Sequence, residues 1–143
     1  MGRIGHFLQK HHGDTASDEE LLARAKLAYT LMFFSRGVPV IYYGDEQGFT
    51  GHGNDQLARQ DMFPSQVDVY NDNQLIGTLA TTAADNFDRQ HPLYQHIAVL
   101  AKIHQGEAGL RRGHQKILQA DDKPGIYAFT RQETNSEAKY LIV

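Results

Sequence analysis

Apolar residues follow a helical period in "SDEELLARAKLAYTLMFFSRG", residues 17–37. One apolar line at intervals of three or four consists of Leu21, Ala25, Ala28 and Met32. Ser17 followed by Glu20 forms a capping box, in which each side chain covers an exposed backbone N–H of the first helical turn. Gly37 favours termination of this helix at its C-terminal end. The pattern therefore predicts a helix over residues 17–36.

The next apolar run extends from Val38 to Tyr43 and shows no alternation with polar residues. Such a run is typical of a strand that is covered on both faces, as in a parallel sheet. It stops at Gly44, which two carboxylates follow directly. A parallel strand needs neighbours that are reached through crossover connections. Because the chain contains a single run of this kind, we expect it to be a piece of a larger protein.

Residues 44–90 are rich in Gly, Asn, Asp and Thr, and their weak periodicity predicts a long loop. Loops of this length in compact domains are usually functional or disordered. A second helix is predicted over "HPLYQHIAVLAKIHQ", with Pro92 in its first turn. Beyond it, "QKILQA", "GIYAFTR" and "AKYLIV" alternate with polar turns and predict an antiparallel meander. We therefore predict one unit over residues 1–112 and another over 113–143.

The composition and charge of the chain argue against some classes of partner. The chain has 143 residues, of which 41% are hydrophobic and 22% charged, with a net charge of −3. It lacks a basic block, so neither nucleic acid nor an anionic membrane is expected as a partner. The start is too polar for a signal peptide and no apolar run is long enough to span a bilayer, which leaves the compartment unknown.

The cysteine and histidine content of the chain does not favour a metal site. The chain has no cysteine, which excludes disulfides and thiolate metal sites. Its 8 histidines lack the close spacings of a zinc site, which requires three or four convergent ligands. We therefore expect neither a metal nor another cofactor within this chain.

The stretch "RGVPVIYYGDEQGF" resembles the eighth strand and following loop of the α-amylase family of retaining glycoside hydrolases. The family pattern there is Gly-x-Pro-x-x-x-x-Gly-x-Glu, which Gly37, Pro39, Gly44 and Glu46 meet. Downstream, "GNDQLARQDM" resembles the continuation of that loop, with one residue inserted near His52. "HPLYQHIAVLAKIHQGEAGLRRG" resembles the eighth helix and the entry to a C-terminal β domain, and "MGRIG" resembles the residues after the seventh strand.

The resemblance implies an α/β fold. The chain would hold the last helix–strand–helix units of a (β/α)8 TIM barrel, followed by the first antiparallel strands of a C-terminal β domain. In such barrels the functional residues lie at the carboxyl ends of the strands. A carboxylate just beyond residues 38–43 would then lie where substrate binds.

The resemblance also implies the reaction. The parent would cleave α-glucosidic bonds in starch-like glucans by a retaining mechanism, and its catalytic carboxylates would lie after barrel strands outside this chain. We therefore expect no catalytic residue here and no hydrolysis by this chain alone. Calcium would belong only to the full-length parent. Alternatives are a transglycosylase, an enzyme acting on sucrose, trehalose or α-1,6-glucans, and a non-catalytic carbohydrate-binding or interaction module.

Five residues are carried over as candidate substrate contacts of the complete enzyme. Asp55 and Arg59 match loop positions that hold a glucose unit, although their spacing also suits a simple ion pair. Glu46 suits a loop anchor better than a direct contact. Tyr43 offers an aromatic face but lies in an apolar run, and Arg3 falls where the family places an active-site arginine. We also expect self-association, since an unpaired strand edge seeks a partner.

Overall fold

The computed structural model describes residues 3–12, 15–51 and 55–143. The chain forms two compact units, which are treated separately below. The first comprises the residues up to Tyr29 together with Val40–Ala98, and the second comprises Thr30–Pro39 together with Val99–Val143. The domain boundary near Arg112 stays a prediction.

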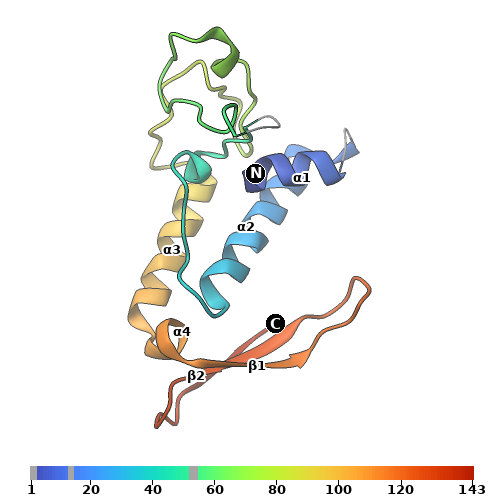
Figure 1. Cartoon of the computed structure of the whole chain (residues 1–143), viewed down its shortest axis with the longest axis vertical. Helices are drawn as coiled ribbons and strands as arrows, with labels where there is room; N and C mark the ends of the chain where they lie inside the picture. Colours follow the sequence, from blue (N-terminus) through green and yellow to red (C-terminus); the bar gives the residue numbers. More distant parts are fainter. Residues whose placement is uncertain (1–2, 13–14, 52–54) are drawn as a thin grey trace. The chain divides into compact units, whose positions relative to one another are not determined.

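Helix α1 (Ile4–His12) and most of helix α2 (Asp18–Phe34) belong to the first unit (Figure 1). Helix α1 was not predicted, whereas α2 confirms the predicted helix. The capping box is present, because the Ser17 amide donates to Glu20 Oε2 at 3.0 Å and the Glu20 amide donates to Ser17 Oγ at 3.2 Å. The apolar core of this unit contains Leu8, Leu21, Ala25, Tyr29, Phe49, Ala58, Leu75, Ile76 and Leu93.

Replacing Ser17 by alanine should lower the free energy of unfolding by about 1 kcal/mol, because the Glu20 amide loses its acceptor. Urea-induced unfolding followed by circular dichroism would measure the change. Ser35→Ala is the matched control, since Ser35 follows the other end of α2 and cannot cap its N-terminus. Equal effects of the two substitutions would show that the capping box does not stabilise the helix.

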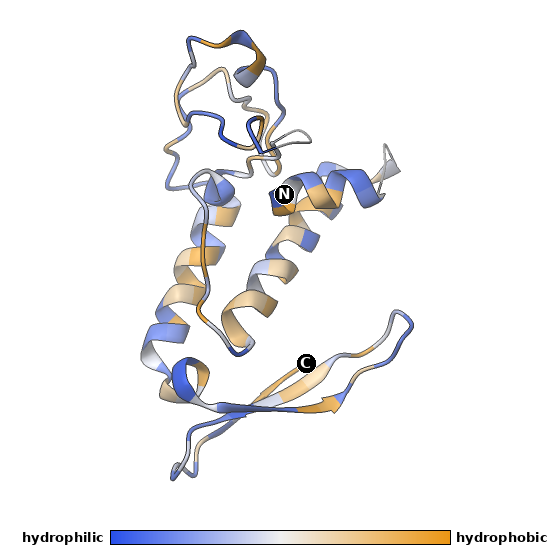
Figure 2. Ribbon diagram, viewed as in Figure 1, coloured by the Kyte–Doolittle hydropathy of each residue, from blue (hydrophilic) through white to orange (hydrophobic). Residues whose placement is uncertain are grey.

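The segment from Val38 to Tyr42 is extended but is not a strand, so the strand prediction is wrong for this chain. Within the described residues it has no ladder partner, and Val38 and Val40 are 86% and 71% exposed. Figure 2 shows the apolar colouring that runs along this extended segment after α2. A strand exists only where a neighbour completes its hydrogen bonds, and an apolar pattern alone cannot supply one.

The long loop over residues 44–90 is confirmed, and it has a core of its own. In its described residues, 44–51 and 55–90, regular structure is limited to two short 3₁₀ helices, η2 (Asp45–Gln47) and η3 (Asp68–Tyr70), and one isolated bridge between Gln74 and Thr81. Gly48 is required here, because its φ is +75° and a Cβ would lie 2.2 Å from the Ile76 carbonyl oxygen. The Ile76 amide in turn donates to the Gly48 carbonyl at 2.9 Å.

Helix α3, Pro92–Gly106, confirms the second predicted helix. Pro92 is its first residue, and His91 caps it, because the Leu93 amide donates to His91 Nδ1 at 3.2 Å. His91 is 2% exposed. Burial lowers its pKa and outweighs the opposite effects of the Ile76 backbone and of Asp88 and Asp18.

This lowered pKa predicts a loss of stability in mild acid. The folded state binds fewer protons than the unfolded state, so stability is complete above the ordinary histidine value of about 6.5 and falls below it. His91→Asn keeps a capping acceptor but does not titrate. The unfolding free energy of the wild type should therefore fall more than that of the variant between about pH 7.5 and about pH 5.5. If the unfolding free energies of the wild type and of His91→Asn fall equally with pH, the lowered pKa of His91 does not cause the loss of stability.

The second unit carries a 3-stranded antiparallel sheet, which confirms the predicted meander (Figure 1). Helix α4, Ala108–Arg112, precedes strands β1 (His114–Gln119), β2 (Ala128–Gln132) and β3 (Lys139–Ile142), and β2 is central. His114 pairs with Gln132, and Phe129 pairs with Ile142. Residues 128–131 of β2 are all buried, so the central strand forms the core of this unit.

A buried arginine ties this sheet to two helix ends. Arg131 is 1% exposed, and its guanidinium donates to three backbone carbonyls. Nη1 reaches the Phe34 carbonyl at 2.8 Å, Nη2 reaches the Leu110 carbonyl at 2.6 Å, and both Nη2 and Nε reach the Gly113 carbonyl, at 3.1 and 3.3 Å. Phe34 ends α2, and Leu110 and Gly113 belong to the end of α4. The charge thus satisfies carbonyls that a helix end leaves without partners.

Across the described part of the chain, no helix is both long enough and apolar enough to cross a membrane.

Candidate functional site

Arg3 lies at the centre of the first unit's candidate site. It is 4% exposed, and its Nη1 donates to Asp45 Oδ1 at 2.9 Å and to the Tyr43 carbonyl at 2.6 Å. Its Nε donates to the Ala58 carbonyl at 3.0 Å. One guanidinium therefore joins the start of the chain, the η2 turn and the loop around Ala58.

Three aromatic rings surround the same guanidinium. Its central carbon lies 4.7 Å from the ring centre of Tyr42, 5.2 Å from that of Tyr43 and 5.3 Å from that of Phe49. These distances are within cation–π range. Among the described residues, Arg3 Nη2 has no hydrogen-bond partner, so the site retains one unused cationic donor.

The turn at Gly44 positions Asp45 against Arg3. Gly44 has a φ of +85°, and a Cβ there would lie 2.8 Å from the Phe49 ring. Only glycine combines this conformation with that close approach. The chain therefore leaves the extended segment and turns at once into η2, which places the first of its two carboxylates on the buried side.

Burial dominates the electrostatics of this cluster. Burial raises the pKa of Asp45, and Arg3 opposes this rise through its hydrogen bond and its charge. Burial, followed by the Asp45 charge, raises the pKa of the Tyr29 phenol. Burial and a hydrogen bond with Tyr42 raise the pKa of Tyr43 to about 12. Both phenols therefore keep their protons at neutral pH and can donate hydrogen bonds.

A cavity of about 700 Å³ opens beside Arg3, and its lining includes Asp45, Tyr42, Asp55 and Arg59. This volume falls in the range of ligand pockets, about 300–1,000 Å³. Asp55 and Arg59 form an i,i+4 ion pair, and their side chains are 72% and 60% exposed. The structure thus brings three of the five predicted residues to one cavity that presents both acceptors and donors.

The other two predicted residues line a separate hollow. Glu46 and Tyr43 border a cavity of about 460 Å³ together with Ile41, Tyr94 and Ile97. Within the described residues, Glu46 Oε2 is buried without a hydrogen-bond partner. Tyr43 connects the cavity beside Glu46 with the cavity beside Arg3, since its carbonyl and its ring both contact Arg3. The roles of all five residues toward substrate stay predictions.

The sequence prediction missed Asp45 and Tyr42. Asp45 was adjacent to the chosen Glu46, and both follow the same apolar run, so composition could not separate them. No local signal separates them, because the partner of Asp45 is Arg3, 42 positions away. Among the described residues, no three His, Asp or Glu side chains gather as a metal site would require. The expected absence of a cofactor stays a prediction.

Comparisons with known proteins agree on one family. The family model for the alpha amylase catalytic domain matches residues 3–110. An alpha-amylase from Streptomyces lividans is 47% identical over 99% of this chain and 15% of its own length. A beta/alpha-amylase from Paenibacillus polymyxa is 29% identical over 97% of the chain and 9% of its own length.

A cyclomaltodextrinase from Geobacillus thermopakistaniensis is 28% identical over 83% of the chain and 17% of its own length. The chain therefore spans a small part of each of these curated relatives, between 9% and 17% of their length. No solved structure matches it. The match over residues 3–110 includes the buried arginine, the η2 turn and the ion-paired loop. The chain belongs to the alpha-amylase catalytic-domain family.

Proposed function

We propose that this chain forms the last part of a (β/α)8 barrel and the first strands of a C-terminal β domain in an α-glucan hydrolase. The observation that carries the proposal is the buried Arg3–Asp45 ion pair at the wall of a cavity that Asp55 and Arg59 also line. The exposed apolar segment from Val38 to Tyr42 supports the barrel, because neighbouring strands would complete its hydrogen bonds.

The chain's part in the reaction is to hold substrate. Asp55 accepts from sugar hydroxyls and Arg59 donates in a planar fork, while Arg3 supports the wall of the same cavity through its ion pair with Asp45. Retaining hydrolysis requires a nucleophile and an acid about 5 Å apart. We assign both carboxylates to barrel strands outside these residues. Glu46 keeps a structural role within the η2 turn, beside the cavity that Tyr43 also borders, and Tyr43 serves as a support for Arg3.

Hydrolysis is preferred over transglycosylation because the relative at 47% identity is called an alpha-amylase. That name also favours starch-like glucans as substrate over sucrose or trehalose. Calcium, if the parent uses it, would bind outside this chain. We expect neither nucleic acid nor a membrane among the partners of this chain.

A chimera tests this function. The matching segment of the Streptomyces lividans alpha-amylase is exchanged for this chain, and starch hydrolysis is measured. We expect the chimera to be active. Asp55→Ala in the chimera should raise KM about tenfold with a smaller effect on kcat, since a hydrogen bond to a charged group contributes about 1.5–3 kcal/mol. Arg59→Ala should act in the same direction.

Glu133→Ala is the matched control, because it breaks the partly exposed Arg112–Glu133 ion pair in the second unit. It should leave KM unchanged. A folded chimera without activity would contradict the proposal. So would turnover by the isolated chain that Asp55→Ala abolishes, because the catalytic carboxylates would then lie within these residues.

A further inference from the structure

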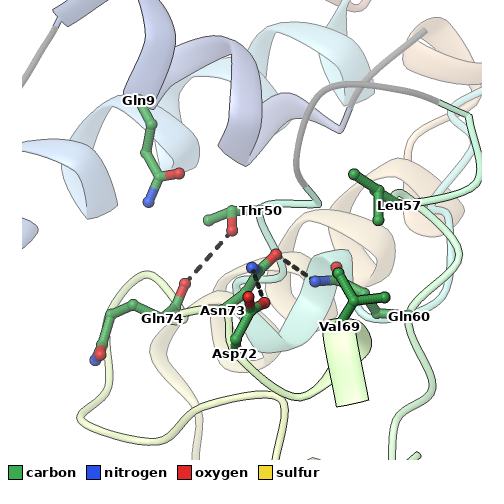
Figure 3. A pocket seen from close by; sticks show the side chains of 8 residues that line it. All are labelled: Gln9, Thr50, Leu57, Gln60, Val69, Asp72, Asn73 and Gln74. Atoms are coloured by element: carbon green, nitrogen blue, oxygen red, sulfur yellow. Dashed lines mark hydrogen bonds between the residues drawn. The ribbon is translucent and has the colours of Figure 1, made fainter. Parts of the chain in front are cut away.

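A third cavity in the first unit has a volume of about 370 Å³ (Figure 3). It shares none of its described lining residues with the cavity of about 700 Å³ beside Arg3, which is called the arginine cavity below. Its wall is dominated by side-chain amides, which belong to Gln9, Gln60, Asn73 and Gln74. They come from α1 and from two parts of the long loop. The proposed function leaves this amide cavity unused.

Three of its side chains form a hydrogen-bonded relay (Figure 3). Asn73 Nδ2 donates to Asp72 Oδ1 at 2.8 Å, and Gln60 Nε2 donates to Asn73 Oδ1. An ionised carboxylate only accepts, so Asp72 fixes which end of the Asn73 amide faces it. Asn73 then presents its oxygen to Gln60, and Gln60 must present its nitrogen in return. The direction of the whole relay follows from Asp72.

The relay ends on an atom without a partner. Gln60 is 1% exposed, and among the described residues its Oε1 has no hydrogen-bond partner. A buried polar atom left unpaired costs about 1–3 kcal/mol. Because the relay fixes this atom as an acceptor, the missing partner must be a donor such as a hydroxyl. A bare anion cannot fill that place.

The other lining residues restrict the chemical class of the ligand. None of the described lining residues is Lys or Arg, and Asp72 adds a negative charge that disfavours anions. Leu57 and Val69 provide apolar surface beside the amides. A saccharide unit combines hydroxyl donors with apolar C–H faces and carries no charge. The cavity volume is near the lower end of the range for ligand pockets, which suits a small ligand.

We propose that the amide cavity is a second saccharide-binding site, in which a sugar hydroxyl donates to Gln60 Oε1. It binds one neutral sugar unit outside the arginine cavity. The inference does not depend on the proposed hydrolase function, because a sugar can bind here whether or not the arginine cavity holds substrate.

Titration of the 143-residue chain with maltose tests the site. The readout is the NMR signals of the side-chain NH₂ groups of Gln60 and Asn73, followed to about 50 mM sugar, since weak sites lie in the millimolar range. Both signals should shift with saturation. Gln60→Met should weaken binding at least about tenfold, the equivalent of one lost hydrogen bond to a fixed acceptor. Inorganic phosphate should produce no shift.

Two further variants keep the test decisive. Asp72→Asn changes an exposed residue, so the variant should fold normally. The new amide can donate as well as accept, so it no longer holds the Asn73 and Gln60 amides in one orientation, and maltose binding should weaken. Arg59→Gln lies in the arginine cavity and should leave these signals unaffected. Absence of maltose shifts in the folded wild type would overturn the proposal, since a water alone then fills the place. Shifts that Arg59→Gln abolishes would overturn it as well.

Discussion

Replacing Arg3 by methionine should lower the free energy of unfolding by about 3–5 kcal/mol, the range for removing one partner of a buried ion pair. The Arg3 and Asp45 side chains are 1% and 9% exposed. The substitution leaves Asp45 buried without its counter-charge and removes the donors to the Tyr43 and Ala58 carbonyls. Urea-induced unfolding, monitored by circular dichroism, measures the loss.

Arg59→Met is the matched control for this prediction. It also breaks an arginine–aspartate pair in the same unit, but that pair is solvent-exposed and should contribute less than about 1 kcal/mol. Adding Asp45→Asn to Arg3→Met should restore part of the lost stability, because the stranded charge is then gone. Similar effects of Arg3→Met and Arg59→Met would show that burial of the first pair does not control stability.

Arg131→Met should be comparably damaging, with an expected loss of at least about 3 kcal/mol. The variant leaves the carbonyls of Phe34, Leu110 and Gly113 without the guanidinium that satisfies them. Burial lowers the pKa of Arg131, but arginine keeps its charge at neutral pH, so charged hydrogen bonds are lost. Urea-induced unfolding measures the effect, and amide hydrogen exchange in β2 should speed up at the same time.

Arg112→Met provides the comparison within the same unit. Arg112 pairs with Glu133 on the surface, and its side chain is 67% exposed. Its loss should change the unfolding free energy by less than about 1 kcal/mol. If Arg112→Met and Arg131→Met destabilise the protein equally, the buried guanidinium is not the tie between β2 and the helix ends.

The sequence by itself determined helices α2 and α3 and the meander. The capping box of Ser17 and Glu20 and the start of α3 at Pro92 depend on residues within one helical turn, so local order in the sequence reveals them. The strands of the meander lie next to one another in both sequence and space. The Asp55–Arg59 ion pair could also be predicted from the sequence, because its members are four residues apart.

Tertiary structure decided everything that depends on partners distant in the sequence. The apolar run after Gly37 indicates burial, but only a neighbouring strand can make it part of a sheet, and none exists among the described residues. Arg3 meets Asp45 across 42 positions, and Gln60 meets Asn73 across 13. Hydrogen bonds and ion pairs act over a few ångströms, so their effect depends on which segments the fold brings together, and residue types alone do not reveal this.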